Sequence, residues 1–592
     1  MREEAGGQRL SAAARFLGRR LARSGRAAYL DGRLQLLDLA VGHLNAADTA
    51  PATTFAAVVA PHAGVAGAVT HCRRLVVPRL STGRRDRREQ KVVVPLEIDT
   101  STPFGAQRMG GEQDPPLVGT GWFPGITPED FGAGKAWLDD IISPALIVNE
   151  AHVRHNVKTV IGKVGGPNRW RPHLKTTKMK WVWRILIEEG VRNFKVATTK
   201  EAEAMIQLVH EMLSLKDTVD VLVAYPLVGP NLRALGRLTQ TPGASQIKLS
   251  VLVECDRAID DVVALDCGIG VFIDINPGMD RTGLAYRQHA YVDDRDGEAQ
   301  HSLKDVLELI IKAKSRNVFR GIHYYEGHIS ECMAERDGLS PNQSILKEKL
   351  DARELKCLMC YDRWLVPIFH DSLKDGKPSA CGEIKPEIIT SGTPGFTHAL
   401  RYSKFRIITL TDQLMRDSPI DRSEEAKFSD SIYHGIHRVS PGTVVFHDWR
   451  GERQNPGLGL KPAAVVMARV VSNPRAGMVT LDCGSKSIAA EAGDPAGHVI
   501  GYPEVTARSC SEEHMPCSVA ELAESSGKRK RGATDPWQSK NRGEVCFVVP
   551  EHICPTVNLA DEVVVIPEGS SEIEVRRVDA RGHHLRLEDI QV

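Results

Sequence analysis

From Ser143 onward, short apolar runs alternate with amphipathic stretches along the chain. Phe194–Ala197 has the pattern of a buried strand, and a helical pattern starts at Thr199 directly after it. Other strand-like runs in this region are Pro144–Val148, Val219–Ala224, Lys248–Glu254, Gly270–Ile275, Phe319–Tyr324 and Glu387–Thr390. Repeated strand–helix units predict an α/β fold with a closed (β/α)8 TIM-type barrel, whose active site would lie at the carboxyl ends of the strands.

The helical pattern thins out after about residue 401. Strand-like runs then follow at Val444–Phe446, Ala463–Val471, Met478–Asp482, Val545–Val549, Glu562–Ile566 and His583–Glu588. Two polar inserts, 416–431 and 518–542, interrupt them. The pattern therefore predicts a barrel over residues 137–401 and a β-rich domain over residues 402–592.

Residues 1–136 have a different composition, rich in Ala, Gly, Arg and Pro and with little periodicity. This N-terminal extension is predicted to be disordered or weakly folded. Its stretch Ala12–Leu30 is Arg-rich, as in organellar transit peptides, but Glu3 and Glu4 argue against targeting. A cytoplasmic location is the first expectation, with organellar targeting as the alternative.

Composition narrows the class of protein. The 592 residues are 42% hydrophobic and 26% charged, and the net charge is +1, which favours neither nucleic acid nor an anionic membrane as partner. The 12 cysteines lack framework spacing and indicate a reducing compartment, so Cys357 and Cys360 are expected to be packed or free thiols. No apolar run has the length of a membrane span. The sequence leaves open whether the protein is a monomer or a homodimer.

The stretch Arg171–Lys178 carries the first candidate for chemistry. Lys175 follows a short run, Asn168–Leu174, that reads as a strand end, and a helical pattern follows at Met179–Gly190. A lysine that loses part of its solvation at such a place becomes usable as a Schiff-base amine. On spacing alone, a solvated basic loop is the alternative reading.

Three more strings follow predicted strands. Thr390–Gly395 offers hydroxyls and backbone N–H groups to a phosphate, and Arg281 in Asn276–Gly283 can donate to an anionic oxygen. Tyr325–His328 places an aromatic ring beside an imidazole. Each string alone is compatible with an ordinary turn. At the ends of barrel strands, however, they are expected to converge on one pocket.

His552 and Cys554 form a candidate metal-ligand pair in the β-rich part. Residues two apart in an extended segment point to the same side, so both side chains can reach one ion. Imidazole with thiolate favours zinc, and a two-ligand site leaves positions for substrate or water. The string Ser511–His514 is a further candidate for the same place.

Together these strings resemble the D-threonine aldolase and D-serine dehydratase family of pyridoxal-phosphate (PLP) enzymes, whose barrel is related to that of alanine racemase. The matching strings are Arg171–Thr176, Ala224–Pro230, Gly278–Gly283, Tyr325–His328, Ser391–Pro394, Ser440–Thr443, Ser511–His514 and His552–Asn558. They occur in order from about Ser143 to Ile566. The N-terminal extension lies outside the resemblance.

The resemblance implies roles for individual residues. Lys175 would bind the cofactor covalently, with His173, Arg281 and Tyr325 around its ring. Ser391, Gly392 and Thr393 would lie at its phosphate. His552 and Cys554 would hold Zn²⁺, with Mn²⁺ as the alternative. The chain departs from the family at Thr177, where a histidine is usual.

The implied activity is that of a lyase acting on a D-β-hydroxy amino acid. Cys554 resembles the zinc-dependent dehydratases, which convert D-serine to pyruvate and ammonia. The strings around Arg281 and Ser391 look closer to D-threonine aldolases, which release glycine and acetaldehyde. A non-catalytic PLP-binding protein and a racemase are further alternatives, and a racemase would have no use for the metal pair.

Overall fold

The structure is a computed structural model, which describes residues 75–78, 91–94, 123, 125–212, 218–287, 301–330, 343–368, 387–402, 405, 436–502, 505–519 and 542–590. It divides into two units, residues 1–112 and 113–592. In the first unit, β1 (Leu75–Pro78) pairs antiparallel with β2 (Lys91–Val94). The candidate transit segment Ala12–Leu30, the insert 416–431 and most of the insert 518–542 lie outside the described residues.

Seven parallel strands form the barrel sheet of the second unit. Their order is β4 (Asn193–Val196), β5 (Val219–Val223), β6 (Ile247–Val253), β7 (Gly270–Ile275), β10 (Phe319–Tyr324), β11 (Glu387–Thr390) and β12 (Ile436–Val439). The two edges of this sheet meet at the segment 170–173, where Trp170 pairs with Val439 and His173 with Lys195, both in parallel. This segment takes the eighth strand position, and the predicted α/β barrel fold is confirmed.

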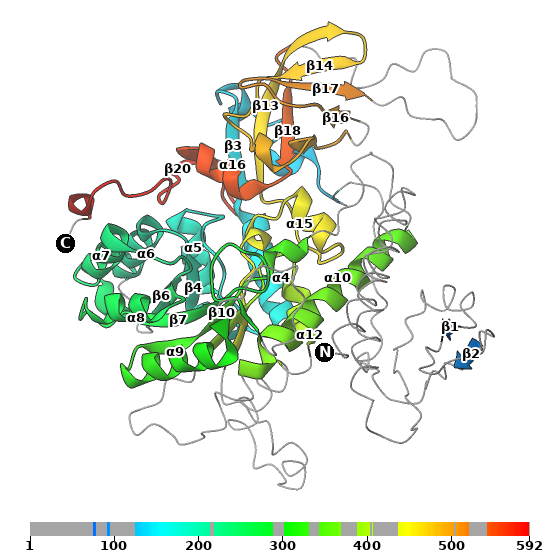
Figure 1. The fold of residues 1–592 in the computed structure, drawn as a ribbon. Helices are drawn as coiled ribbons and strands as arrows, with labels where there is room; N and C mark the ends of the chain where they lie inside the picture. Colours follow the sequence, from blue (N-terminus) through cyan, green and yellow to red (C-terminus); the bar gives the residue numbers. More distant parts are fainter. Residues whose placement is uncertain are drawn as a thin grey trace, which may run out of the picture. The chain divides into compact units, whose positions relative to one another are not determined.

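Helices lie around this barrel, as Figure 1 shows for α5 to α9. The helices of this half are α4 (Glu150–Val164), α5 (Lys180–Glu188), α6 (Thr199–Glu211), α7 (Gly229–Leu238), α8 (Asp256–Val263), α9 (Leu303–Ser315), α10 (Gln343–Trp364) and α12 (Phe396–Arg401). Local chemistry fixes their ends: the Asn149 side chain accepts a hydrogen bond from the His152 N–H at the start of α4, and Gly165 ends that helix in a left-handed conformation.

A second, mixed sheet carries the β-rich half. Its strands are β3 (Ala145–Asn149), β13 (Ala464–Arg475), β14 (Met478–Leu481), β15 (Gly497–Val499), β16 (Val505–Ala507), β17 (Met515–Val519), β18 (Val545–Pro550), β19 (Glu562–Ile566) and β20 (Glu574–Arg577). The run 144–148 is therefore a strand, as predicted, but not a barrel strand. It pairs antiparallel with β13 and parallel with β19.

Other elements also differ from the sequence-based prediction. Val444–Phe446 contributes to a 3₁₀ turn at Thr443–Val445, and His583–Glu588 contains no strand. A short buried apolar run cannot be told from a buried helical turn by its pattern alone. β12 lies in the barrel although it follows residue 401, and Phe131, from the expected N-terminal extension, packs into a core with Trp449 and Phe547.

Arg171 ties the closing segment of the barrel to two other strands. Its side chain has no exposed surface, and its guanidinium donates to both carboxylate oxygens of Glu387 at 2.7 and 2.6 Å and to Asp220 at 2.8 Å. Glu387 begins β11 and Asp220 lies in β5. The ion pairs of Arg171 with Glu387 and Asp220 therefore fix the segment that leads into Lys175.

Arg171→Met should destabilise the fold by up to about 3–5 kcal/mol, because the buried Glu387 carboxylate would lose its bidentate partner and keep its ion pair with Arg438. The free energy of unfolding in urea is the measurement. Arg154→Met is the matched control, since Arg154 pairs with carboxylates on a half-exposed surface and its loss should cost about 1 kcal/mol or less. Equal effects of the two substitutions would contradict the role given to Arg171.

Within the described residues, no helix is both long and apolar enough to cross a membrane.

Candidate active site

A cavity of about 200 Å³ opens where the carboxyl ends of the barrel strands face the β-rich half. Eight of the nine site residues expected from the sequence line it: His173, Lys175, Arg281, Tyr325, Gly392, Thr393, His552 and Cys554. They come from loops after different barrel strands and from the segment after β18. The structure thus brings together strings that are up to several hundred residues apart.

Lys175 lies in the turn that follows the eighth strand position. Its side chain is exposed toward the cavity, so the burial expected for it from the sequence is not found. The main chain beneath it is fixed, since the Leu174 N–H donates to the Lys195 carbonyl at 2.7 Å and the Lys195 N–H donates to the Pro172 carbonyl at 2.9 Å. The amine is therefore accessible on a rigid base.

The turn with Lys175 is also held from the C-terminal part of the chain. The Lys178 ammonium donates to Glu201 at 2.8 Å and to the Ala580 carbonyl at 3.3 Å, and the Ala580 N–H donates to the Lys178 carbonyl at 3.0 Å. The Asp579 carboxylate accepts from the Lys180 N–H at 2.8 Å. Thr177, where the resemblance leads one to expect histidine, is buried and its hydroxyl accepts from the Trp183 indole at 2.8 Å.

Tyr325 forms one wall of the cavity beside Arg281. The Arg281 guanidinium lies 4.9 Å from the centroid of the Tyr325 ring. The ring fits because its neighbours are glycines: an added Cβ would lie 2.3 Å from the ring at Gly327 and 2.7 Å at Gly392. The two glycines therefore leave room for a flat aromatic wall.

Gly392 and Thr393 begin the turn after β11 that was expected to hold a phosphate. Ser440, after β12, lies next to this turn and its N–H donates to the Ser391 carbonyl at 2.9 Å. The Ser440 hydroxyl lines the cavity, is buried, and has no hydrogen-bond partner within the described residues. An anionic oxygen would provide that partner, so this corner fits a phosphate.

Ser391 is the one expected residue that does not line the cavity. Its hydroxyl contacts the Glu326 carboxylate and lies 2.9 Å from the Tyr361 hydroxyl. Burial raises the pKa of Glu326, although these hydrogen bonds act in the opposite direction. The Ser391 side chain thus anchors the turn to Glu326 and Tyr361. Its contact with a phosphate remains a prediction.

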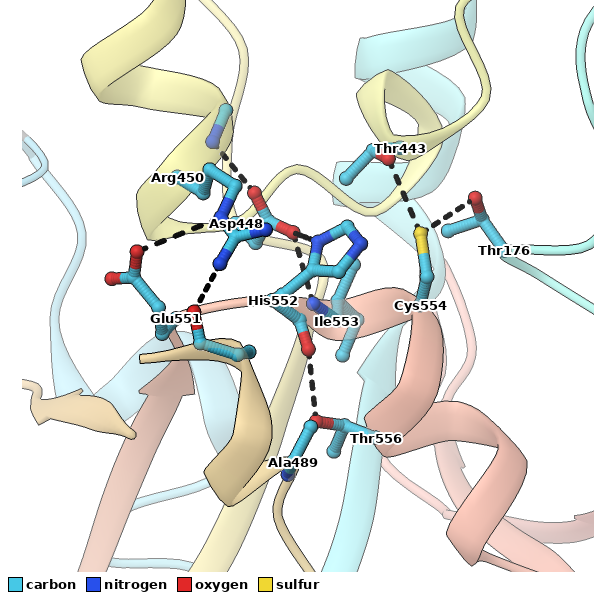
Figure 2. Close-up of polar contacts among 12 residues, drawn as sticks. Thr176, Thr443, Asp448, Arg450, Ala489, Glu551, His552, Ile553, Cys554 and Thr556 are labelled. Carbon is cyan, nitrogen blue, oxygen red and sulfur yellow. Dashed lines mark hydrogen bonds and ion pairs between the residues drawn. The ribbon is translucent and has the colours of Figure 1, made fainter. Parts of the chain in front are cut away.

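His552 and Cys554 lie together, but not in the extended segment that was expected. His552 caps α16 (Ile553–Leu559) and Cys554 lies in its first turn. The Asp448 carboxylate accepts from His552 Nδ1 at 2.8 Å and from the Ile553 N–H at 2.9 Å (Figure 2). Because Nδ1 is used in this way, Nε2 is the ring nitrogen left for a metal.

The thiol of Cys554 faces two hydroxyls, Thr176 Oγ1 at 3.0 Å and Thr443 Oγ1 at 3.2 Å (Figure 2). Burial disfavours a thiolate, but the neighbouring His552 outweighs it and lowers the pKa of Cys554. Burial would likewise lower the pKa of His552, and the Cys554 thiolate and Asp448 raise it to about 10. An imidazole and a readily formed thiolate are donors that fit zinc.

These two side chains are a pair and not a complete metal cage. No group of three or more His, Cys, Asp or Glu side chains in the described part of the chain is arranged to hold a metal ion. The third candidate, His514, is exposed and does not line the cavity. A zinc ion bound here would keep positions open for substrate or water.

The sequence-based prediction missed a row of buried, hydrogen-bonded polar side chains on another wall of the cavity. Lys195 Nζ lies 2.9 Å from His323 Nε2, and His323 Nδ1 lies 2.6 Å from the Asp274 carboxylate. Both Lys195 and His323 line the cavity. The available signal was a charged residue inside a strand whose neighbours are apolar, since Lys195 lies within Phe194–Ala197.

Comparisons with known proteins agree with this architecture. Residues 463–566 match the family described as "Putative serine dehydratase domain". A D-threonine aldolase from Arthrobacter sp is 32% identical over 190 residues, which are 30% of this chain and 44% of that protein. The aligned part therefore spans less than half of the relative's length.

Two solved structures share the fold. D-threonine aldolase from Filomicrobium marinum is 21% identical, with a TM-score of 0.53 over 75% of this chain and 97% of that chain. An alanine racemase-like protein from Idiomarina loihiensis is 17% identical, with a TM-score of 0.50 over 75% of this chain and 98% of that chain. The chain thus has an alanine racemase-like fold with a serine dehydratase-type domain in its β-rich half, and it is similar in sequence to D-threonine aldolase.

Proposed function

We propose that this protein is a PLP- and zinc-dependent lyase that acts on D-β-hydroxy amino acids, with D-serine dehydration as the first choice. One observation carries the proposal: a lysine amine and a carboxylate-oriented His/Cys pair face the same cavity from opposite halves of the chain. An electron sink stabilises the charge that develops at Cα of such a substrate, and a Lewis acid assists the breaking of a bond at Cβ.

The residues around the cavity fit the cofactor. Lys175 offers the amine that would hold its aldehyde carbon, and the Ser440 hydroxyl, which has no partner among the residues that the structure describes, offers a place for its phosphate with Gly392 and Thr393. Arg281 is available to an anionic oxygen beside the Tyr325 ring. When bound, PLP supplies the electron sink for charge that develops at Cα of the substrate.

The side chains of this chain would then divide the work. Lys175, once its amine is released, is placed to take a proton from Cα. His552 and Cys554 would hold zinc as a Lewis acid for the β-hydroxyl, and Asp448 keeps the imidazole in the required tautomer.

D-threonine aldolase activity is the second candidate, because the D-threonine aldolase from Arthrobacter sp is similar in sequence over part of the chain. Cys554 favours the dehydratase, since thiolate with imidazole selects zinc over manganese. The departure from the family at Thr177 favours a PLP-binding protein without turnover. However, the Thr177 hydroxyl accepts a hydrogen bond from the Trp183 indole and Thr177 does not line the cavity, so the departure changes no residue of the cavity wall.

Incubation of the purified protein with D-serine and with D-threonine separates these candidates. We expect pyruvate and ammonia from D-serine, and loss of this activity when a chelator removes the metal. L-serine is the control for stereochemistry. Glycine and acetaldehyde from D-threonine, without pyruvate from D-serine, would establish the aldolase instead, and a reaction that survives complete metal removal would favour a racemase.

A further inference from the structure

The buried amine of Lys195 has no part in the function proposed so far. Lys195 is only 4% exposed, yet its side chain lines the same cavity as Lys175. Lys175 follows the eighth strand position, which is joined to the strand of Lys195 by the main-chain hydrogen bonds of Leu174 and Pro172 with Lys195. A second amine therefore faces the place where the first would meet a substrate.

The direction of the hydrogen bonds that join Lys195, His323 and Asp274 can be assigned from Asp274, the acceptor at the end of this row. Asp274 is a carboxylate that also accepts from the Thr282 hydroxyl at 2.8 Å, so His323 donates to it through Nδ1–H. His323 Nε2 is then an acceptor, and Lys195 donates one N–H to it. When Lys195 is neutral, this bond uses a proton and leaves the nitrogen lone pair available to the cavity.

The surroundings of Lys195 favour this neutral form. Burial lowers its pKa to about 7, the charge of Lys175 acts in the same direction, and Asp274 opposes both. Burial also lowers the pKa of His323 to about 4, so its imidazole is neutral at pH 7 and can accept the hydrogen bond. The charged and titratable groups around Lys195 include Lys175, Asp274, Arg281, Arg171, His173, His323 and Tyr325, whose ring centroid lies 5.9 Å from Lys195 Nζ.

We propose that Lys195 is the base that removes a proton from the substrate's ammonium group before that nitrogen replaces Lys175 at the aldehyde carbon. This inference rests on the proposed function, but it is common to the dehydratase and the aldolase. An α-amino group has a pKa of about 8 or higher, so it is mostly protonated at pH 7 and has no lone pair for attack.

The protons balance in this exchange. The substrate ammonium gives one proton to the neutral Lys195 amine, and the free substrate nitrogen forms its bond to the carbon. Breaking of the bond from that carbon to Lys175 would release Lys175 as the neutral amine that the step at Cα requires, and Lys195 would pass its extra proton to solvent. Lys195 returns to its neutral form without any added reactant.

The first test is the pH dependence of kcat/KM for D-serine in the wild-type holoenzyme and in Lys195→Met. We expect the wild-type value to rise with pH through about 7, as neutral Lys195 becomes populated. Lys195→Met should retain the cofactor absorbance band and lose about 100- to 10,000-fold in kcat/KM at pH 7. Its profile should rise only as the substrate ammonium itself loses its proton, and kcat should change less than kcat/KM.

Lys248→Met is the matched control, because Lys248 is an exposed lysine on strand β6 of the same sheet and lies outside the cavity. It should keep the wild-type profile. A Lys195→Met profile that still rises near pH 7 with unchanged kcat/KM would overturn the role of Lys195 and leave the proposed function standing. A wild-type holoenzyme without turnover of any D-β-hydroxy amino acid would overturn the proposed function itself.

The second test measures the amine without turnover and remains decisive if Lys195→Met does not fold. Trace acetylation of the cofactor-free protein between pH 5 and 10, followed by mass spectrometry of the Lys195 peptide, reports the titration of this amine. We expect a midpoint near pH 7 in the wild type and a lower one in Asp274→Asn, because Asp274 stabilises the charged form. A midpoint above pH 9 in both proteins would overturn the inference.

Discussion

Lys175→Ala is expected to remove the cofactor absorbance band and to lower turnover of D-serine by at least about 100- to 10,000-fold, because the substitution removes both the covalent anchor and a proton-transfer group. The fold should remain intact, since the Lys175 side chain is exposed toward the cavity and a substitution at such a place usually changes stability by about 0.5 kcal/mol or less. The absorbance spectrum, recorded beside the product assay, is the measurement.

Lys178 provides the control within the same turn. Its ammonium is buried against Glu201, so Lys178→Met should cost stability, by about 3–5 kcal/mol, and should retain the absorbance band when folded. A band that persists in Lys175→Ala would show that another amine holds the cofactor, and the peptide labelled after borohydride reduction would identify it.

Removal of the metal pair is the second change with a large expected effect. His552→Ala and Cys554→Ala should each lose stoichiometric zinc on dialysis and should lose lyase activity together with it, because one remaining side chain cannot retain the ion in competition with water. Metal analysis of the dialysed protein is the measurement. Cys554→Asp should shift the preference from zinc toward manganese, since carboxylate oxygen is a harder ligand than thiolate sulfur.

Two further substitutions test whether this effect belongs to the site. Asp448→Asn leaves both ligands in place and removes the carboxylate that orients His552, so zinc affinity should fall by about 10- to 100-fold. His514→Ala should retain wild-type zinc content, because His514 is exposed and away from the cavity. Full zinc retention in the double variant of His552 and Cys554 would place the metal elsewhere.

The barrel could be predicted because most of its strands are largely buried and therefore appear as short runs rich in apolar residues. The same reasoning failed for β3, since a central strand of the mixed sheet has the same kind of run, and nothing in its sequence states which sheet it joins. It also failed for the run around Val444, which is buried as a turn. The pattern of apolar residues indicates that a segment is buried, but it does not show which strand the segment pairs with.

Most of the candidate site could also be predicted, because parallel strands bring their carboxyl ends to one edge and the strings after them converge there. His552 and Cys554 were identified for a geometric reason that the structure does not support, since they begin a helix. Lys195, His323 and Asp274 were missed because they meet only across three different strands. The charge of Lys195 inside an apolar run could have marked that residue, but sequence spacing does not show which side chains it meets.

The position of β3 has a consequence for how the protein is made. β3 is synthesised before the barrel, but its partners β13 and β19 follow the barrel in the chain. It must therefore stay unpaired at the ribosome while the barrel strands emerge, and the hydrogen bonds from Ala580 and Asp579 to the Lys175 turn form later still. Contacts of such long sequence separation slow folding. Lys175 and Lys195 are thus synthesised before His552 and Cys554, and the nascent chain would depend on protection of the unpaired apolar strand β3 during that interval.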